Sequence, residues 1–319
     1  MGRRRTEKGS APSRLYWRIA LTAALAAVLL LLSSRSVREG GGAVRLVAPG
    51  VVCAEVRMSE GPHEVRIVRI QRDEPSAQVD VAMAQGALAG VAPLSEIVAA
   101  ANGRDRPVVA AVNGDFFRML GQTREGAVFG MTVCGGELVK IGRHDECFYL
   151  TDRGTPGIAL LDVEGSVESA KLRSPIVGLN NPSTGDGVTL YTRGWGWAVD
   201  DAAVVCELFE GPLRSEGLWE ARAVEVLEAG AGRVPRGNEL FVCPHGPQRA
   251  GMLSLRVGAE VSIELSTDGP DSPMQMAVGG NWPLLKDGRI VTPKRSLLSK
   301  RHPRTAIGYN SEEVFLLTC

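Results

Sequence analysis

Apolar and polar residues alternate along much of the chain in the pattern typical of β-strands. Within residues 44–85, apolar side chains recur at or near every second position over residues 65–70 and 79–83, which predicts two strands. From about residue 145 to about residue 275 no helical period persists, and short apolar runs lie at residues 157–161, 188–192, 202–208, 223–227, 240–243 and 261–265. The pattern predicts a β-rich α+β fold with a few short helices and a large mixed or bent sheet, or else a pair of sheets.

A helix and a buried strand are predicted ahead of a polar turn. Residues 93–103 begin with Pro93 and end with Asn102-Gly103, which are start and stop signals for a short helix. The apolar residues 106–112 then predict a buried strand that leads into Asn113-Gly114-Asp115. A polar turn after a buried strand is a common position for site residues.

Glycine-containing turns predict two hairpins further along the chain. Gly135-Gly136 lies at the centre of residues 129–141, and Asp287-Gly288 forms the tip of a second turn. Residues 313–318 predict a last strand, which ends next to Cys319. Because no repeat of constant period is present, residues 44–319 are predicted to form one domain.

The N-terminus has the composition of a targeting segment. Residues 1–18 form a basic region with six basic residues and one acidic residue, a net charge of +5, and residues 19–32 carry no charge. A linker over residues 33–43 follows. Fourteen helical residues span about 21 Å, less than the roughly 30 Å of a bilayer core, so a cleaved signal and an uncleaved membrane anchor both stay open. Either one predicts an extracytoplasmic protein, secreted or anchored to the membrane.

Composition restricts the classes of partner and cofactor. Lys and Arg total 36, as do Asp and Glu, so charge gives no reason to expect nucleic acid as a partner. None of the six cysteines forms a C-x-x-C pair, which argues against a zinc knuckle. No cofactor and no metal site are predicted, although loop aspartates leave a divalent cation such as calcium open. The cysteines allow one or two disulfides, with buried free thiols as the alternative.

Two polar segments are candidates for a functional site. Asn113 and Asp115 suit a hydrogen-bonding or acid/base pair at a pocket mouth; the alternative is an Asx turn with Phe116 and Phe117 in the core. Arg304 leads into an apolar strand, where a charge needs a partner, and its guanidinium suits a phosphate.

Glycine pairs and tryptophans supply further candidates. Gly279-Gly280 permits close backbone approach to a ligand, or forms a bulge. Trp195 and Trp197, each preceded by a glycine, suit stacking on a sugar ring, with a place in the core as the alternative.

Three segments together resemble the phosphodiester glycosidase family. They are residues 109–117 (VAAVNGDFF), 278–290 (VGGNWPLLKDGRI) and 302–308 (HPRTAIG). The resemblance rests on their order and spacing and covers roughly residues 60–318. This family includes the N-acetylglucosamine-1-phosphodiester α-N-acetylglucosaminidase called the uncovering enzyme, and bacterial exopolysaccharide-related proteins.

The resemblance implies a hydrolase that acts on a sugar-1-phosphodiester of an extracytoplasmic glycan. It releases the sugar and leaves a phosphomonoester. At the matching positions, the resemblance implies Arg304 as the phosphate ligand and Asp115 as an acid/base or stabilising carboxylate. The other implied substrate-binding residues are Asn113, Thr305, Gly279 and Gly280, and Trp195 is a further candidate for contact with the sugar.

The chain departs from the family pattern at its C-terminus. Family members continue past the strand that here ends at Thr318, into an Asp-Gly-Gly-Gly-Ser/Thr motif that this sequence lacks. The resemblance therefore predicts an incomplete site, with weak or no activity for these 319 residues. Two alternatives stay open: a non-catalytic glycan-binding protein of an envelope or exopolysaccharide system, and an inactive fragment.

Overall fold

A computed structural model describes residues 43–58, 63–103, 106–119, 121–142, 146–170, 172–183, 185–291 and 302–319. The basic region, the signal or anchor segment and nearly all of the linker predicted before residue 43 lie outside the described residues. The described chain consists mainly of β-strands, with short helices at η1 (Ala84–Gly86), α2 (Leu94–Ala101), η2 (Gly246–Gln248) and α3 (Arg249–Leu253). The prediction of a β-rich chain with few helices is confirmed.

The two ends of the described chain meet in one sheet, which we call the terminal sheet. Its strand order is β1-β2-β3-β19-β18, and every neighbouring pair is antiparallel. The late strand β19 pairs with the early strand β3, with Leu317 opposite Ile67. The strands are β1 (Val44–Ala48), β2 (Val51–Met58), β3 (His63–Gln71), β18 (Thr305–Tyr309) and β19 (Glu313–Thr318).

A second five-stranded sheet, the middle sheet, has the order β5-β4-β15-β6-β7. Strand β15 enters this sheet from much later in the sequence and pairs with both β4 and β6. Its strands are β4 (Thr132–Cys134), β5 (Glu137–Lys140), β6 (Glu146–Thr151), β7 (Pro156–Leu160) and β15 (Met274–Gly279).

Seven strands close into a barrel in the order β10-β13-β11-β12-β14-β8-β9. The parallel pairing of β9 with β10 completes the closure, whereas the other barrel pairs are antiparallel. The barrel strands are β8 (Val163–Ser169), β9 (Leu172–Leu179), β10 (Gly187–Tyr191), β11 (Ala203–Leu208), β12 (Gly217–Leu227), β13 (Glu239–His245) and β14 (Glu260–Thr267). A small hairpin of β16 (Leu285–Lys286) and β17 (Arg289–Ile290) stands apart.

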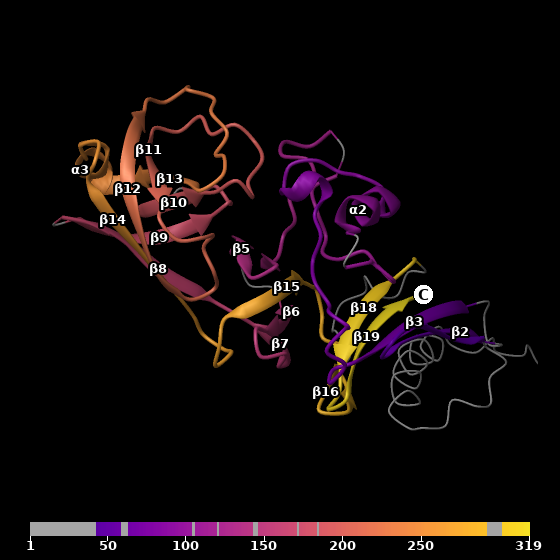
Figure 1. Cartoon of the computed structure of the whole chain (residues 1–319). Coiled ribbons are helices and arrows are strands. Elements are labelled where there is room, and N and C mark those ends of the chain that lie inside the picture. The colour runs from indigo at the N-terminus through magenta and orange to yellow at the C-terminus, as the bar shows by residue number, and fades with distance from the viewer. Residues whose placement is uncertain are drawn as a thin grey trace, which may run out of the picture.

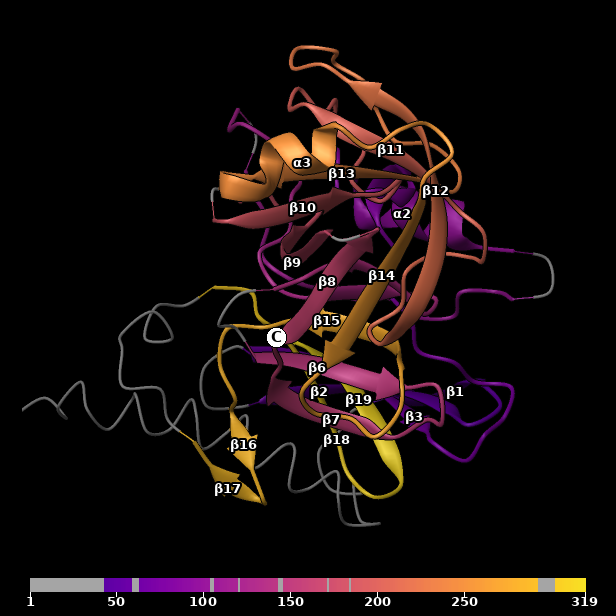
Figure 2. The same cartoon turned by 90° about the vertical axis from the view of Figure 1, so that its left-hand side faces the viewer.

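The middle sheet lies between the barrel and the terminal sheet (Figures 1 and 2). Neighbouring residues of a strand face opposite sides of a sheet. Cys147 accordingly packs in the core shared with the barrel, and Phe148 packs in the core shared with the terminal sheet. On β15, Ala277 and Met276 divide between the same two cores. These two cores fix the order of the three layers.

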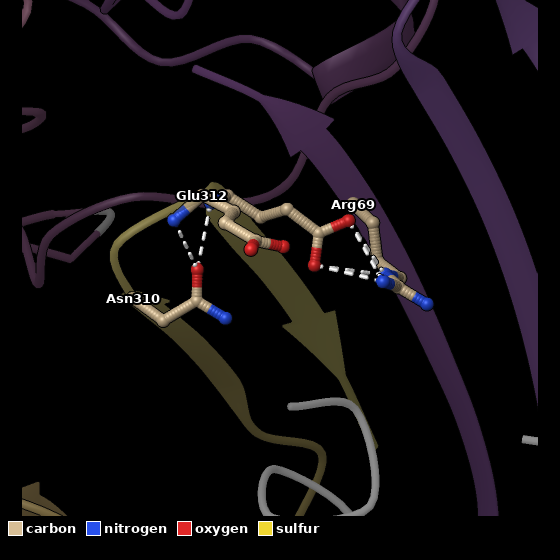
Figure 3. Close-up of polar contacts among 4 residues, drawn as sticks. Arg69, Asn310 and Glu312 are labelled. Carbon is tan, nitrogen blue, oxygen red and sulfur yellow. Dashed lines mark hydrogen bonds and ion pairs between the residues drawn. The ribbon is translucent and has the colours of Figure 1, made fainter. Parts of the chain in front are cut away.

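A polar network fixes the hairpin between β18 and β19 (Figure 3). The side-chain oxygen of Asn310 accepts hydrogen bonds from the backbone N–H groups of Glu312 and Glu313, at 2.8 and 2.7 Å. The guanidinium of Arg69, on β3, donates to both carboxylate oxygens of Glu313 over 2.8–3.2 Å. The pair ties the last hairpin to the first part of the chain.

Most of the predicted elements are present, but they are not joined as predicted. The helix, the two hairpins and the final strand are confirmed as α2, β4–β5, β16–β17 and β19. The apolar runs between residues 157 and 265 all form strands or parts of strands. The predicted large mixed sheet is present in part as the seven-stranded barrel, which contains one parallel pair. The other strands divide among two five-stranded sheets and a hairpin, so a single large sheet does not contain them all.

Two predicted strands are absent from the described structure. Residues 79–83 and 106–112 form no β-ladder with any described segment. Residues 106–112 were expected to be buried, yet none of them is, and Val109 is 42% exposed. Some of their backbone groups bond instead to side chains: the N–H of Val81 donates to Asp80 Oδ1, and the N–H of Val108 donates to Asn102 Oδ1. In the described chain no strand pairs with either segment, and a strand needs such a partner along its length.

Candidate functional site

A large cleft of about 2690 Å³ is lined by many segments of the chain. Among these segments are the turn that follows residues 106–112, the end of β15 and the start of β18. The terminal and middle sheets place these segments next to one another, because β18 and β15 belong to sheets that share a core. Six of the predicted site residues border this cleft: Asn113, Asp115, Gly279, Gly280, Arg304 and Thr305.

The carboxylate of Asp115 is held by backbone donors. The N–H of Phe116 donates to its Oδ1 at 2.7 Å, and the N–H of Gly130 donates to its Oδ2 at 2.5 Å. Both carboxylate oxygens therefore accept a hydrogen bond from the backbone. The side chain is half-buried and still borders the cleft, so it is oriented and remains accessible.

Two glycines make room for this carboxylate. A Cβ added to Gly279 would lie 2.6 Å from the Asp115 Oδ2 and 2.7 Å from the Gly130 Cα. A Cβ added to Gly130 would lie 2.6 Å from the Gly279 Cα. No side chain fits between the two backbones at these distances. Gly279 thus permits a close approach, but the group that approaches is the Asp115 side chain. Contact between Gly279 and a ligand stays a prediction.

Arg304 stands where the chain enters β18. Its N–H donates to the carbonyl of Cys319 at 2.7 Å, and the N–H of Cys319 donates back to the Arg304 carbonyl at 2.9 Å. The backbone of Arg304 is therefore fixed by the strand beside it, while its half-buried side chain borders the cleft. Thr305 follows as the first residue of β18, opposite Thr318. Their roles toward a phosphate stay predictions.

The prediction that Trp195 contacts a sugar is wrong. Its side chain is 3% exposed and belongs to the core that also contains Tyr191. The Tyr191 and Trp197 rings lie 5.1 and 4.7 Å from it between centroids, and the Arg124 guanidinium lies 5.4 Å from the ring centroid. A sugar cannot stack on a ring whose faces are covered by protein. Trp195 does not border the cleft.

Exposed aromatic side chains occur instead next to Asp115. Phe116, Phe117 and Phe129 are 53%, 47% and 48% exposed. The first two border the cleft, and Phe129 is tied to them because its N–H donates to the Phe116 carbonyl at 3.0 Å. The alternative that placed Phe116 and Phe117 in the core is wrong. Their position directly after the polar turn was the only signal in the sequence that they would reach the cleft.

The thiol of Cys147 lies under the same region and is not a nucleophile. Burial raises its pKa to about 12, and the negative charges of Glu146 and Asp115 add to this effect. The thiolate is the reactive form of cysteine, so Cys147 remains a protonated core residue at neutral pH. All six cysteines are free thiols, and none pairs in a disulfide.

The described residues contain no cluster of three or more His, Cys, Asp or Glu side chains arranged to hold a metal ion. The predicted possibility of a calcium ion in aspartate loops receives no support from this part of the chain. Residues 143–145, which include His144, lie outside the described ranges.

Two solved structures share the fold of this chain. A hypothetical protein from Synechocystis superposes with a TM-score of 0.63 and 18% identity over 88% of this chain and 52% of that one. A predicted exported protein from Burkholderia pseudomallei superposes with a TM-score of 0.57 and 16% identity, over 94% of this chain and 68% of that one. At such identities the likeness concerns the fold alone. The chain spans about half the length of the Synechocystis protein.

No protein-family profile and no curated protein matches the sequence. In the described ranges, no helix has the length and apolar character needed to cross a bilayer.

Proposed function

We propose that the protein hydrolyses a sugar-1-phosphodiester on an extracytoplasmic glycan, releasing the sugar and a phosphomonoester. The observation that carries the proposal is the common cleft bordered by Asp115 and Arg304, which lie far apart in the sequence. A carboxylate and a guanidinium on one cleft suit a substrate with an anionic phosphate next to an anomeric carbon.

In the proposed reaction, the bond between the anomeric carbon and the phosphate oxygen breaks. The phosphate leaves with the electron pair, and water supplies a hydroxyl group to the anomeric carbon and a proton to the products. Arg304 binds the phosphate and stabilises the charge that develops on the leaving oxygen. Asp115 serves as the acid/base or stabilising carboxylate near the anomeric carbon. Asn113 and Thr305 position the substrate, and the backbone of Gly280 forms part of the floor of the substrate site.

An extracytoplasmic location belongs to the same proposal. The basic and apolar segments of residues 1–32 have the composition of a signal or anchor. The Burkholderia neighbour is a predicted exported protein. Both observations support export of the described domain.

A non-catalytic glycan-binding protein is the second candidate. The burial of Trp195 removes one of the two tryptophans on which this hypothesis depended, and Trp197 is half-buried. The exposed rings of Phe116 and Phe117 at the cleft offer another surface for a sugar face. A binder holds a phosphodiester without consuming it, so turnover separates the two candidates.

The test is an assay of the full chain at high protein concentration against α- and β-sugar-1-phosphate methyl esters. Mass spectrometry follows the free sugar and methyl phosphate together. We expect slow release by the wild-type chain, at least about 100-fold less release by Asp115→Asn, and a KM roughly tenfold higher in Arg304→Gln.

Asp73→Asn and Arg222→Gln are the matched controls, because they remove the same charges away from the cleft and should leave release unchanged. Binding of the esters without release of either product would favour the glycan-binding candidate. A chain that neither binds the esters nor releases a product would overturn both candidates.

A further inference from the structure

A buried lysine that the reaction does not use is linked to the Asp115 carboxylate through one peptide group. Lys140 is the last residue of β5, lies opposite Thr132 of β4, and is 5% exposed. Its ammonium group donates hydrogen bonds to the carbonyls of Val128 and Phe129, the latter at 2.9 Å. Burying an ammonium group is costly unless it is well bonded, and an apolar side chain at such a position usually costs less.

The two carbonyls that Lys140 binds belong to the segment that faces Asp115. The Phe129 carbonyl and the Gly130 N–H are the two ends of one peptide group, and that N–H donates to the Asp115 Oδ2. The same segment is bonded to the chain around Asp115 by Phe129 N–H to the Phe116 carbonyl and by Arg118 N–H to the Ala127 carbonyl, both at 3.0 Å.

A chain of hydrogen bonds thus runs from the ammonium group of Lys140 through one peptide group to the Asp115 carboxylate. A cation at the carbonyl end of a peptide polarises the group and strengthens donation by its N–H. The cation also fixes the plane of that peptide, and the plane sets the direction of the N–H.

We propose that Lys140 is a positioning residue, which acts through the Phe129–Gly130 peptide to hold and orient the carboxylate of Asp115. The inference rests on the proposed function for its consequence in catalysis. It requires no contact between Lys140 and the substrate.

The peptide can be observed directly, because Phe129-Gly130 is the only Phe-Gly pair in the sequence. Labelling phenylalanine with ¹³C at the carbonyl and glycine with ¹⁵N therefore selects one amide signal. A strong hydrogen bond to a carboxylate moves the amide proton downfield. We expect both Lys140→Met and Asp115→Asn to move this signal upfield, and Lys140→Arg to restore part of the shift.

The kinetic readout is the division between kcat and KM. We expect Lys140→Met to lower kcat about 10- to 100-fold, because a misoriented catalytic group loses that much, and to change KM by less than about threefold. Lys140→Arg should recover part of kcat. Thr189→Val, which alters a fully buried polar side chain of the barrel, controls for a general loss of stability and should leave kcat unchanged.

The outcomes separate this inference from the proposed function. An unchanged Phe129–Gly130 signal in Lys140→Met, or a loss of kcat equal to that of Thr189→Val, would overturn the role of Lys140. A wild-type chain with no turnover that still shows the Lys140-dependent signal would overturn the proposed function and leave the orientation of the carboxylate by Lys140 established.

Discussion

At the scale of single residues, the Asp115 carboxylate depends on what its neighbours lack. Gly130 and Gly279 approach within a distance that leaves no room for a Cβ, and one of them also supplies an N–H donor. In the sequence, Gly279 and Gly280 were equally good candidates for a close backbone approach to a ligand. The structure distinguishes them, because only Gly279 abuts the carboxylate.

This difference leads to a prediction. Gly279→Ala should displace the Asp115 carboxylate, since the new Cβ would stand 2.6 Å from its Oδ2, and should lower both activity and stability, the latter by about 1–3 kcal/mol. Gly103→Ala is the control, because an added Cβ there would meet no atom within 4 Å and Gly103 does not border the cleft. Urea unfolding and the phosphodiester assay measure the two effects. Equal effects of both substitutions would contradict the prediction.

Trp195 shows why single residues can mislead. Glycines on either side suggested a flexible loop that offers an aromatic face. In the fold, the Gly196 backbone packs instead against Ala87 and Ala89, from a distant segment. Which segment covers a side chain depends on long-range packing, and local sequence carries no record of it.

At the scale of elements, apolar periodicity located strands well because a strand in a β-rich domain must bury one face. The apolar residues 65–70 and 106–112 gave similar signals, yet only the former gained strands on both sides, β2 and β19. The latter remains unpaired in the described structure. Pairing is a property of two segments, so one segment cannot predict it.

The β18–β19 hairpin supplies a prediction at this scale. Glu313 is 8% exposed and paired with Arg69 of β3, so Glu313→Gln leaves a half-buried guanidinium without its counter-charge. We expect a loss of about 2 kcal/mol in the free energy of unfolding. Glu312→Gln, at the exposed neighbouring position, should change it by less than about 0.5 kcal/mol. Urea unfolding of both variants decides the matter; a Glu313→Gln chain as stable as wild type would refute it.

At the scale of the whole molecule, three thiols are buried in two hydrophobic cores. Cys147 and Cys206 lie in the core between the barrel and the middle sheet, and Cys243 lies in a separate barrel core. Burial raises the pKa of each thiol to about 12. The unfolded chain loses these protons near pH 8.5, whereas the folded chain keeps them.

Folding stability should therefore fall as the pH rises from about 9 toward 12. In that range the unfolded state binds fewer protons than the folded state, and each such thiol contributes a slope of about 1.4 kcal/mol per pH unit. We expect Cys206→Ala to flatten the dependence by one such increment, although it lowers stability at neutral pH. Val205→Ala, at an equally buried neighbour, should leave the slope unchanged. Urea midpoints between pH 8 and 11 measure it, and equal slopes in both variants would exclude the effect.

The amino-acid sequence alone was enough to predict the strand-rich class, a helix within residues 93–103 (observed at Leu94–Ala101), the hairpin turns and the segments that hold polar candidates. Each of these follows from local preference or from the burial of one face, which neighbouring residues encode. The fold was needed to show that the strands divide among separate sheets and a barrel, and that Arg304 and Asp115 border one cleft. It also showed that Trp195 is buried and that Lys140 is linked to the carboxylate through the Phe129–Gly130 peptide. Those facts arise from contacts between segments far apart in the chain, whose energies depend on three-dimensional complementarity.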